Sequence, residues 1–487
     1  MSQIATEPAT RVEKDSMGEM PVPADVLYGA STQRAVLNFP VSGRPVPWEV
    51  IHAFAVLKYA CARVNHSLGR LDKDRAEAIE AACDKIAGGL NDQGGWQRHF
   101  PVDVFQTGSG TSTNMNANEV VANLVCQAND KPIGSSKDPG YLAQGGVHPN
   151  DHVNMGQSSN DTFPTAMHVA AAVAIKESLL PALDRLHKAL VAKAEAWDKV
   201  VKIGRTHLQD ATPIRLGQEF SGYAAQMEHA EDRLHRALHV LGELSIGGTA
   251  VGTGINTHKD FGSMVAAELT EVTGIHFREA ANHFESQAAK DAYVEASGVL
   301  RTIAVSMTKI ANDIRWLGSG PRCGIGELKL PAVQPGSSIM PGKVNPVICE
   351  SVMMLAARVL GNDTTVTAGG LGGIGSLIDL NVAMPVMAEA MLDSINLLAR
   401  GADMFRENLV DGLEPDKERC AELIEGSLAM CTSLAPVIGY DKAAAMAKQA
   451  YAEGKTVREV ALEQGEVPEG ELSRLLDPMS MTEPDAE

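Results

Sequence analysis

The stretch YVEASGVLRTIAVSMTKIANDIRWL, residues 293–317, decides the fold class of this chain. Its apolar residues recur at gaps that alternate between three and four, and they are Tyr293, Ala296, Leu300, Ile303, Met307, Ile310, Ile314 and Leu317. This spacing is the heptad seam of a helix that packs along other helices. With a start at Glu285, the helix would span about 50 Å at about 1.5 Å per residue. The sequence therefore predicts a mainly α protein built around a bundle of long helices.

Helical spacing recurs along the rest of the chain. The expected helices cover residues 48–68, 74–90, 119–128, about 160–200 with a kink at Pro181, 214–244, a segment after Pro346, 382–407, 418–429 and 442–450. Four or five of them are long enough for an elongated bundle. Such a bundle often shares its apolar faces with copies of itself, so we expect a homo-oligomer. From Glu466 on, we expect a solvated acidic tail.

Composition and charge exclude several classes of function. The 487 residues suffice for two or three domains, and 44% of them are hydrophobic, which indicates a globular chain. The formal charge of −19, without a long basic run, argues against nucleic acid and anionic membranes as partners. A small anionic substrate would therefore need local positive charge in its pocket.

Cysteine usage and the absence of long apolar runs predict the compartment. The seven cysteines are scattered and form no Cys-x-x-Cys pair, which argues for a reducing compartment and against a zinc or iron–sulfur site. We expect no signal peptide and no membrane span, because no basic segment precedes an apolar stretch at the start and no apolar run is long enough. A cytoplasmic location is the prediction.

The segment GSSIMPGKVNP, residues 336–346, reads as a loop that could bind an anion. Its glycines and prolines disfavour helix and strand. We expect Asn345 to cap the next helix, with Pro346 at the first helical position. Hydroxyls, an ammonium and an amide beside a helix N-terminus suit anion binding. The alternative is a surface turn with incidental polar residues.

Other polar clusters also lie at helix ends. QTGSGTSTNMN (106–116) precedes one expected helix, and QSSND (157–161) precedes another, with one of Asn160, Asp161 and Thr162 expected as its cap. These clusters are either anion cradles or simple helix caps. Residues 202–213 read as a polar connector, in which His207 is a candidate acid or base, unless it is an exposed and idle histidine.

Two further patterns carry less weight as sites. His148 and His152 lie four residues apart, but the proline between them argues against a shared helical face for a metal. We expect His152 to be a surface histidine. Residues 370–375 match a dinucleotide fingerprint formally, but we reject it because no strand is expected before it.

Several long motifs in one order resemble the class II fumarase family of the fumarase/aspartase superfamily. The signature loop at 336–346 is joined by TGSGT (107–111), HPND (148–151), QSSND (157–161) and GRTHLQD (204–210). The resemblance covers about residues 11–459. Aspartases typically carry Gln where His207 stands, so His207 favours the fumarases.

The resemblance implies a fold and an activity. The fold would be three-domain and mostly helical, with domains at 1–156, 157–414 and 415–487, and would form a homotetramer whose active sites are shared between subunits. The reaction would be the reversible hydration of fumarate to (S)-malate, a step of the tricarboxylic acid cycle, with no metal or cofactor. The alternatives are an aspartate ammonia-lyase of the same superfamily and a helical scaffold without catalysis.

The resemblance also implies roles for individual residues. Ser337 would take the proton from carbon, and His207, oriented by Glu350, would handle the hydroxyl or water. The substrate-binding positions would be Ser109, Gly110, Thr111, Ser158, Ser159, Asn160, Thr206, Ser338, Lys343, Val344 and Asn345. A second dicarboxylate site would comprise His148, Pro149, Asn150 and Asp151.

The chain departs from the family pattern at two places. Met155 stands where some fumarases have lysine, which bears on the second site only. Ile378-Asp379-Leu380-Asn381 replaces the usual Phe-Glu-Leu-Asn after an unusual glycine run.

Overall fold

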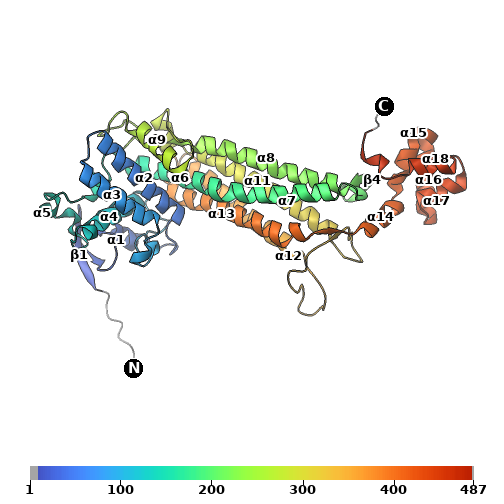
Figure 1. Ribbon diagram of the computed structural model, residues 1–487, viewed down its shortest axis with the longest axis horizontal. Helices are drawn as coiled ribbons and strands as arrows, with labels where there is room; N and C mark the ends of the chain where they lie inside the picture. Colours follow the sequence, from blue (N-terminus) through green and yellow to red (C-terminus); the bar gives the residue numbers. More distant parts are fainter. Residues whose placement is uncertain (1–8, 485–487) are drawn as a thin grey trace, which may run out of the picture. The chain divides into compact units, whose positions relative to one another are not determined.

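The computed structural model describes residues 9–484, and long helices dominate it (Figure 1). The chain divides into two compact units. Unit 1 comprises Met1–Leu180, Asp232–Thr302 and Ala357–Leu398, and unit 2 comprises Pro181–Glu231, Ile303–Ala356 and Ala399–Glu487. The longest helices are α2 (Trp48–Ser67), α4 (Thr111–Ala128), α6 (Ser159–Ala174), α7 (Leu180–Ala196), α8 (Leu216–Leu241), α11 (Asp291–Leu317), α12 (Val347–Gly370) and α13 (Met384–Asn408).

Helix α11 confirms the heptad prediction. All eight seam residues from Tyr293 to Leu317 are at most 5% exposed. The helix begins at Asp291, so the expected start at Glu285 was wrong. Glu285 belongs to a separate short helix, α10 (His283–Ala288), because the Lys290 ammonium donates to carbonyl oxygens at the end of that helix and stops it there.

Unit 1 opens with a hairpin of β1 (Thr10–Asp15) and β2 (Gly18–Pro23), whose register pairs Thr10 with Pro23. Its remaining elements are α1 (Ala30–Asn38), α3 (Lys73–Ala87), α5 (Pro139–Leu142), α9 (Phe261–Thr273) and the parallel pair β5 (Glu243–Leu244) and β6 (Arg278–Glu279). The apolar helix α2 packs on α3, α6 and α9. The buried carboxylate of Glu119 on α4 accepts hydrogen bonds from the first N–H groups of α1, which otherwise have no partner inside the helix.

The predicted helix over 160–200 is interrupted by one π-helical turn, Ile175–Leu179. It separates α6 from α7, and Pro181 lies within the first turn of α7. The irregularity therefore comes before the proline rather than at it. A proline has no N–H to donate to the preceding turn, and a π-turn is one way in which a helix absorbs such a break.

In unit 2, the predicted polar connector between two long helices is a hairpin formed by residues 201–215. Strands β3 (Val201–Thr206) and β4 (Gln209–Arg215) pair antiparallel, with a bulge between Ile203 and Arg205. A second small pair joins β7 (Leu328–Lys329) to β8 (Glu414–Pro415). The adjacent residues Lys202 and Ile203 on β3 are both buried, and Lys202 belongs to an ion cluster described below.

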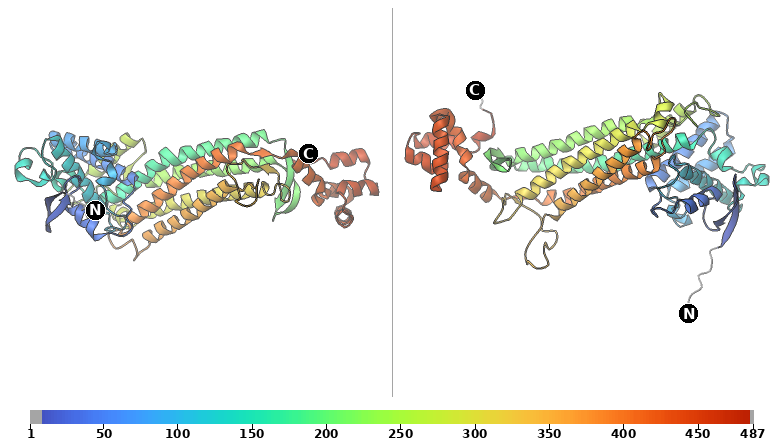
Figure 2. Two further views of the ribbon diagram at one scale, coloured as in Figure 1. Left: turned by 90° about the horizontal axis from the view of Figure 1, so that it is seen from below. Right: turned by 180° about the vertical axis from the view of Figure 1, so that it is seen from behind.

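The C-terminal part of unit 2 is a cluster of short helices, drawn in red in Figure 2. They are α14 (Lys417–Gly426), α15 (Ala435–Ile438), α16 (Tyr440–Glu453), α17 (Val457–Gln464) and α18 (Glu469–Leu475). The expected solvated tail from Glu466 was wrong for the described residues. Leu472 and Leu476 are each only 1% exposed and complete an apolar core.

Two sequence expectations about long segments can be compared with the fold. The glycine-rich run at 369–375 begins in the last turn of helix α12 and is not preceded by a strand, which confirms the rejection of a dinucleotide fingerprint. Among the described residues, one helical run, Ser159–Ala196, is long and apolar enough to span a membrane. A bent pair at Lys417–Gly426 and Leu428–Ile438 would be long and apolar enough only if its two helices are counted as one span. Of the apolar window in Ser159–Ala196, 67% is buried inside the protein, as in a core helix.

Candidate active site

A cluster of hydroxyl groups joins the N-termini of two helices in unit 1. Thr111 is the first residue of α4, and Ser159 is the first residue of α6. Thr111 Oγ1 lies 2.7 Å from Ser159 Oγ and 2.9 Å from Ser109 Oγ. The structure thus brings together three of the sequence-predicted binding residues, which we call the hydroxyl cluster.

Glycine is required just before α4. Gly110 is the N-cap of that helix with φ at 72°, a left-handed conformation that favours glycine. A Cβ at this position would lie 2.0 Å from the ring of Phe163 on α6. The missing side chain therefore lets the two helix starts approach each other.

Ser158, rather than one of the three predicted residues, caps helix α6. Its Oγ accepts from Asn160 N, and the Asp161 carboxylate in turn accepts from Ser158 N, which completes a capping box. The side chain of Asn160 instead donates to the carbonyl of Ala250 at 2.8 Å. The Asp161 side chain is buried inside the protein, and this burial raises the pKa of its carboxyl to about 6.

Helix N-termini and hydroxyls make the hydroxyl cluster suited to an anion. The first N–H groups of α4 and α6 point toward their own N-terminal ends, and each helix carries a partial positive charge there. Hydroxyls of Ser109, Thr111 and Ser159 add donors that rotate to suit a ligand. Two such starts side by side match the carboxylates of a small acid.

The predicted second dicarboxylate site is organised around a neutral histidine. His148 Nδ1 accepts from Asn150 N and Asp151 N, so it caps the π-helical turn Pro149–Val153. Nδ1 also lies 3.3 Å from a carboxylate oxygen of Asp151. Burial lowers the pKa of His148, so the ring is neutral near pH 7 and its Nδ1 acts as an acceptor. His152 is partly buried rather than a surface residue, and its Nδ1 accepts from His148 N.

A polar cavity of about 440 Å³ in unit 1 lies beside both groups of predicted residues. Its lining includes Asn150 and Asp151 of the second site and Ser158 of the first. Met155, one of the departures from the family pattern, also lines it.

In unit 2, His207 lies at the exposed tip of the β3–β4 hairpin. His207 and Leu208 both have positive φ, at 57° and 60°. Two-residue turns with positive φ at both positions normally use Asn-Gly, because bulky residues are strained there. The backbone of His207 and Leu208 is therefore strained, at a hairpin tip where the His207 imidazole is exposed to solvent. Thr206 ends β3 beside it and is also exposed.

The loop 336–346 is closed on itself by polar contacts. Gly336 N donates to Lys343 O at 2.8 Å, and the Asn345 amide donates to Gly336 O at 2.7 Å. The Asn345 side chain therefore closes the loop and does not cap α12 as predicted, and that helix begins at Val347. The contact across the loop is available because Gly336 brings its backbone close to Asn345.

Ser337 receives two backbone hydrogen bonds in this loop. Its Oγ accepts from Ile339 N at 3.2 Å and from Met340 N at 3.0 Å. Donors of this kind favour the negatively charged form of an oxygen over its protonated form. The sequence did not reveal them, because they come from the backbone and depend on how the loop turns.

The other predicted residues of unit 2 are largely exposed. Lys343 and Val344 line a cavity of about 620 Å³ that also contains Arg322, Lys329 and Arg419. Ser338 is exposed on the loop, and Glu350 is exposed in the first turn of α12. Across residues 9–484, no hydrogen bond or ion pair joins Glu350 to His207 within the chain.

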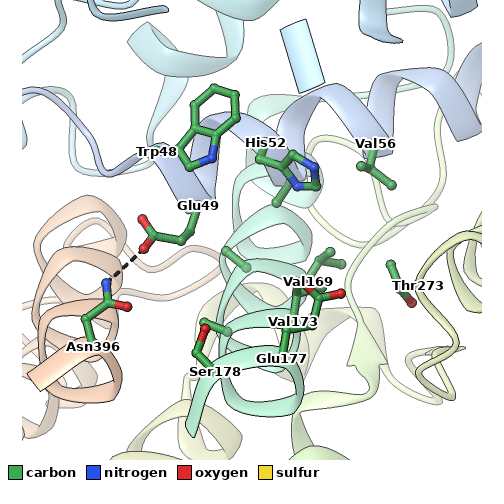
Figure 3. A pocket seen from close by; sticks show the side chains of 13 residues that line it. Trp48, Glu49, His52, Val56, Val169, Val173, Glu177, Ser178, Thr273 and Asn396 are labelled. Carbon is green, nitrogen blue, oxygen red and sulfur yellow. Dashed lines mark hydrogen bonds between the residues drawn. The ribbon is translucent and has the colours of Figure 1, made fainter. Parts of the chain in front are cut away.

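A separate pocket in unit 1 contains none of the predicted site residues (Figure 3). Side chains of α2 and α6 line it, with the Glu49 carboxylate accepting from the Asn396 amide at 2.8 Å. Its lining is largely apolar, with Trp48 beside it, and its volume is about 180 Å³. Within the described residues, no group of three or more His, Cys, Asp or Glu side chains is arranged to hold a metal ion.

Sequence reasoning missed one residue next to the hydroxyl cluster. Lys58 on α2 is fully buried and donates to Asn114 on α4. The signal was a lysine in an apolar helical stretch, where a charge is rarely buried without partners.

Comparisons with known proteins identify the family. A family model described as "Lyase" matches residues 18–361, and one described as "Fumarase C C-terminus" matches residues 430–483. A "Fumarate hydratase class II" of Corynebacterium efficiens is 52% identical over 100% of this chain and 99% of that protein. The chain belongs to the class II fumarase family.

Other members of the class II fumarase family agree with this. A "Fumarate hydratase class II" of Mycobacterium tuberculosis is 52% identical over 97% of this chain and 96% of its own length. The crystal structure of a class II fumarase from Schistosoma mansoni matches with a TM-score of 0.91 at 37% identity, over 97% of this chain and 99% of that one. The mainly α, fumarase-like fold with its long-helix bundle is thereby confirmed.

Proposed function

We propose that this chain is a fumarate hydratase that interconverts fumarate and water with (S)-malate, a step of the tricarboxylic acid cycle. The observation that carries the proposal is the hydroxyl cluster, in which Thr111 and Ser159 meet at 2.7 Å across two helix N-termini. Neutral donors with positive helix ends bind a carboxylate without requiring a cation in the pocket. The full-length similarity to class II fumarate hydratases supports the same reaction.

The proposed chemistry assigns proton removal to Ser337. Removing a proton beside a carboxylate adds negative charge to that carboxylate, and fixed donors stabilise the charge as it develops, each by roughly 3–4 kcal/mol in known oxyanion sites. The two backbone N–H groups that reach Ser337 Oγ support its role, because they favour the alkoxide that acts as the base. Lys343 and Asn345 on the same loop would bind substrate carboxylate.

His207 would handle the water or hydroxyl, with Glu350 fixing its tautomer. Both side chains are exposed in the single chain, and no contact within residues 9–484 joins them. This supports a pair formed between copies of the chain. A homotetramer with shared active sites is therefore part of the proposal.

Exposed apolar side chains on the long helices also support an oligomer. Val305 and Trp316 on α11 are 56% and 44% exposed, and Met354 and Leu360 on α12 are 68% and 42% exposed. Faces of this kind are typical of surfaces covered by a second subunit. Light scattering coupled to size exclusion should give a mass four times that of the chain, and a monomer with full activity would contradict shared sites.

A mixing experiment tests whether the sites are shared. Inactive Ser337→Ala and inactive His207→Asn proteins are unfolded together and refolded. If one site draws Ser337 and His207 from different subunits, mixed tetramers regain part of the activity that neither parent shows. Mixtures that remain as inactive as the parents would contradict the shared site.

The reaction itself is tested by the absorbance of the fumarate double bond. Purified protein with fumarate should lose absorbance without ammonium and form (S)-malate. Loss that occurs only with ammonium would instead identify an aspartate ammonia-lyase. No loss in either condition, from a folded protein, would leave the scaffold alternative.

The proposal also includes the location of the protein, its domain boundaries and a second binding site. The chain is expected to act in the cytoplasm, supported by seven free cysteines, and cell fractionation would test it. The three domains at 1–156, 157–414 and 415–487 would be tested by limited proteolysis at their boundaries. The site around His148 would bind a second dicarboxylate, which titration of a His148→Asn protein with malate would test.

A further inference from the structure

The ammonium group of Lys58 contacts the two segments that carry the hydroxyl cluster in unit 1. Lys58 is on α2 and is 0% exposed, and among residues 9–484 no carboxylate lies within ion-pair distance of its ammonium. Its Nζ donates to Asn114 Oδ1 at 2.7 Å, Gln157 Oε1 at 2.8 Å and Asn154 Oδ1 at 3.0 Å. An ammonium has three N–H donors, so three amide oxygens satisfy it completely.

The three amide acceptors belong to the two segments that carry the hydroxyl cluster. Asn114 lies one turn into α4, three residues after Thr111. Asn154 and Gln157 lie in the turn that leads into α6, immediately before Ser158 and Ser159. The lysine therefore binds, from one point, both helix starts whose hydroxyls meet at 2.7 Å.

The acceptors are themselves fixed by other contacts. The Asn154 amide donates to Gln157 O at 3.2 Å, and the Gln157 amide donates to Val153 O and Met155 O at 3.1 Å. Thr162 Oγ1 of α6 donates to Asn114 Oδ1 at 3.2 Å. We call Lys58, Asn114, Asn154 and Gln157 the amide latch. Because its members restrain one another, a change at Lys58 affects both helix starts.

The charge of Lys58 is retained in this setting. Burial lowers its pKa to about 8, which leaves the amine mostly protonated at pH 7. The groups that face it are the buried thiols of Cys61 and Cys83 and the carboxyl of Asp161 in α6. Losing the ammonium would leave Gln157 Oε1 without its donor and would remove one donor each from Asn114 Oδ1 and Asn154 Oδ1, which is costly for buried oxygens.

We propose that Lys58 is a positioning residue for substrate binding. Its ammonium holds the start of α4 against the turn before α6, and so keeps Thr111 and Ser159 at the spacing that a dicarboxylate needs. The inference rests on the proposed function, since it takes the hydroxyl cluster as the carboxylate site. Lys58 does not contact the ligand itself.

Steady-state kinetics of a Lys58→Met protein test this inference. Methionine keeps an unbranched apolar stem of similar size and removes the ammonium with its donors. If the hydroxyl cluster binds the carboxylate equally in ground and transition states, KM for fumarate should rise by about tenfold or more while kcat changes by less than about threefold. A purely structural role would lower the active fraction, and so kcat, without raising KM.

Direct binding of succinate gives a second readout. Succinate is a dicarboxylate without a double bond, so calorimetry measures its dissociation constant without turnover. The constant should rise in Lys58→Met by the same factor as KM. The matched control is Lys73→Met on α3, where the side chain is 68% exposed, and it should match the wild type in both readouts.

The outcomes separate this inference from the proposed function. A wild-type protein without hydratase activity would contradict the proposed function. An active wild type with a folded Lys58→Met whose KM and succinate affinity stay within twofold would overturn the role of Lys58 alone. If Lys58→Met fails to fold, Gln157→Met removes one acceptor and keeps the lysine. It should raise KM severalfold, and an unchanged KM there would overturn the inference.

Discussion

Replacing Glu327 by glutamine should destabilise unit 2 strongly, because it removes the central charge of a buried ion cluster. Glu327 is 0% exposed, and both of its carboxylate oxygens accept from Arg205 Nη1, at 2.9 and 2.8 Å. Lys202 Nζ lies 3.3 Å from the same carboxylate and 3.2 Å from Glu219. Arg205 and Lys202 are on β3, so the cluster also anchors the hairpin that ends in His207.

The magnitude follows from the burial of the partners. The Lys202 side chain is 1% exposed and that of Arg205 is 12% exposed, so neither can be rehydrated freely. Breaking a buried ion pair by removing one partner costs about 3–5 kcal/mol. At about 2–4 °C per kcal/mol for units of this size, the melting temperature should fall by roughly 10 °C.

Differential scanning calorimetry of wild type and Glu327→Gln, at one protein concentration and scan rate, measures this. Glu422→Gln is the control, because it removes an exposed acid that pairs with Arg419, and it should change the melting temperature little. Replacing all four charged residues of the cluster with apolar ones should recover much of the loss. A Glu327→Gln protein that melts within about 2 °C of the wild type would refute the reasoning about this cluster.

Three further predictions concern the site and the core. Ser337→Ala should lower kcat by at least about 100-fold with little change in KM for fumarate, since general-base catalysis contributes a rate factor of that size. Near-normal turnover in the absorbance assay would exclude Ser337 as the base. Burial lowers the pKa of His168 to about 4. As the pH falls from about 6.5 to 4, the wild type should therefore lose about 1.4 kcal/mol of stability per pH unit relative to His168→Gln, because only the unfolded state of the wild type binds the proton in this range. Urea unfolding at several pH values measures this, and a stability difference between the two proteins that does not change with pH would contradict it. Gly110→Ala should lower the free energy of unfolding in urea by about 1–3 kcal/mol, because the added methyl group overpacks against Phe163. Gly222→Ala in α8 has open space around it and should not destabilise the protein. Equal stability of the two variants would contradict the close approach of Gly110 to Phe163.

The long helices could be predicted because their signal is local. The alternation of three and four from Tyr293 to Leu317 depends only on one face being buried, and that face is buried. Helix ends were less predictable. Whether residue 285 begins α11 depends on Lys290 meeting carbonyl oxygens at the end of α10, a contact that no periodicity contains. A kink was expected at Pro181, but the break is a π-turn that precedes the proline.

The candidate site was found through motifs, and its geometry came from contacts between distant residues. The hydroxyls of Thr111 and Ser159 were both predicted as binding groups, and their meeting depends on Gly110 clearing the ring of Phe163. The hairpin that carries His207 was not predicted as strands, because burial on β3 does not alternate: the charged Lys202 and its neighbour Ile203 are both buried. Lys58 was missed because its role depends on three amide oxygens from two other segments.

The left-handed pair His207–Leu208 has a consequence for engineering heat resistance. Each non-glycine residue in this conformation costs roughly 1–2 kcal/mol, so Leu208→Gly offers a more durable hairpin at a single position. Glycine also frees the tip to swing, and the imidazole would then spend less time in one orientation. The Leu208→Gly protein should therefore keep its activity longer on heating but turn over more slowly. Residual activity measured after incubation at high temperature, together with kcat, would show both effects in this one variant.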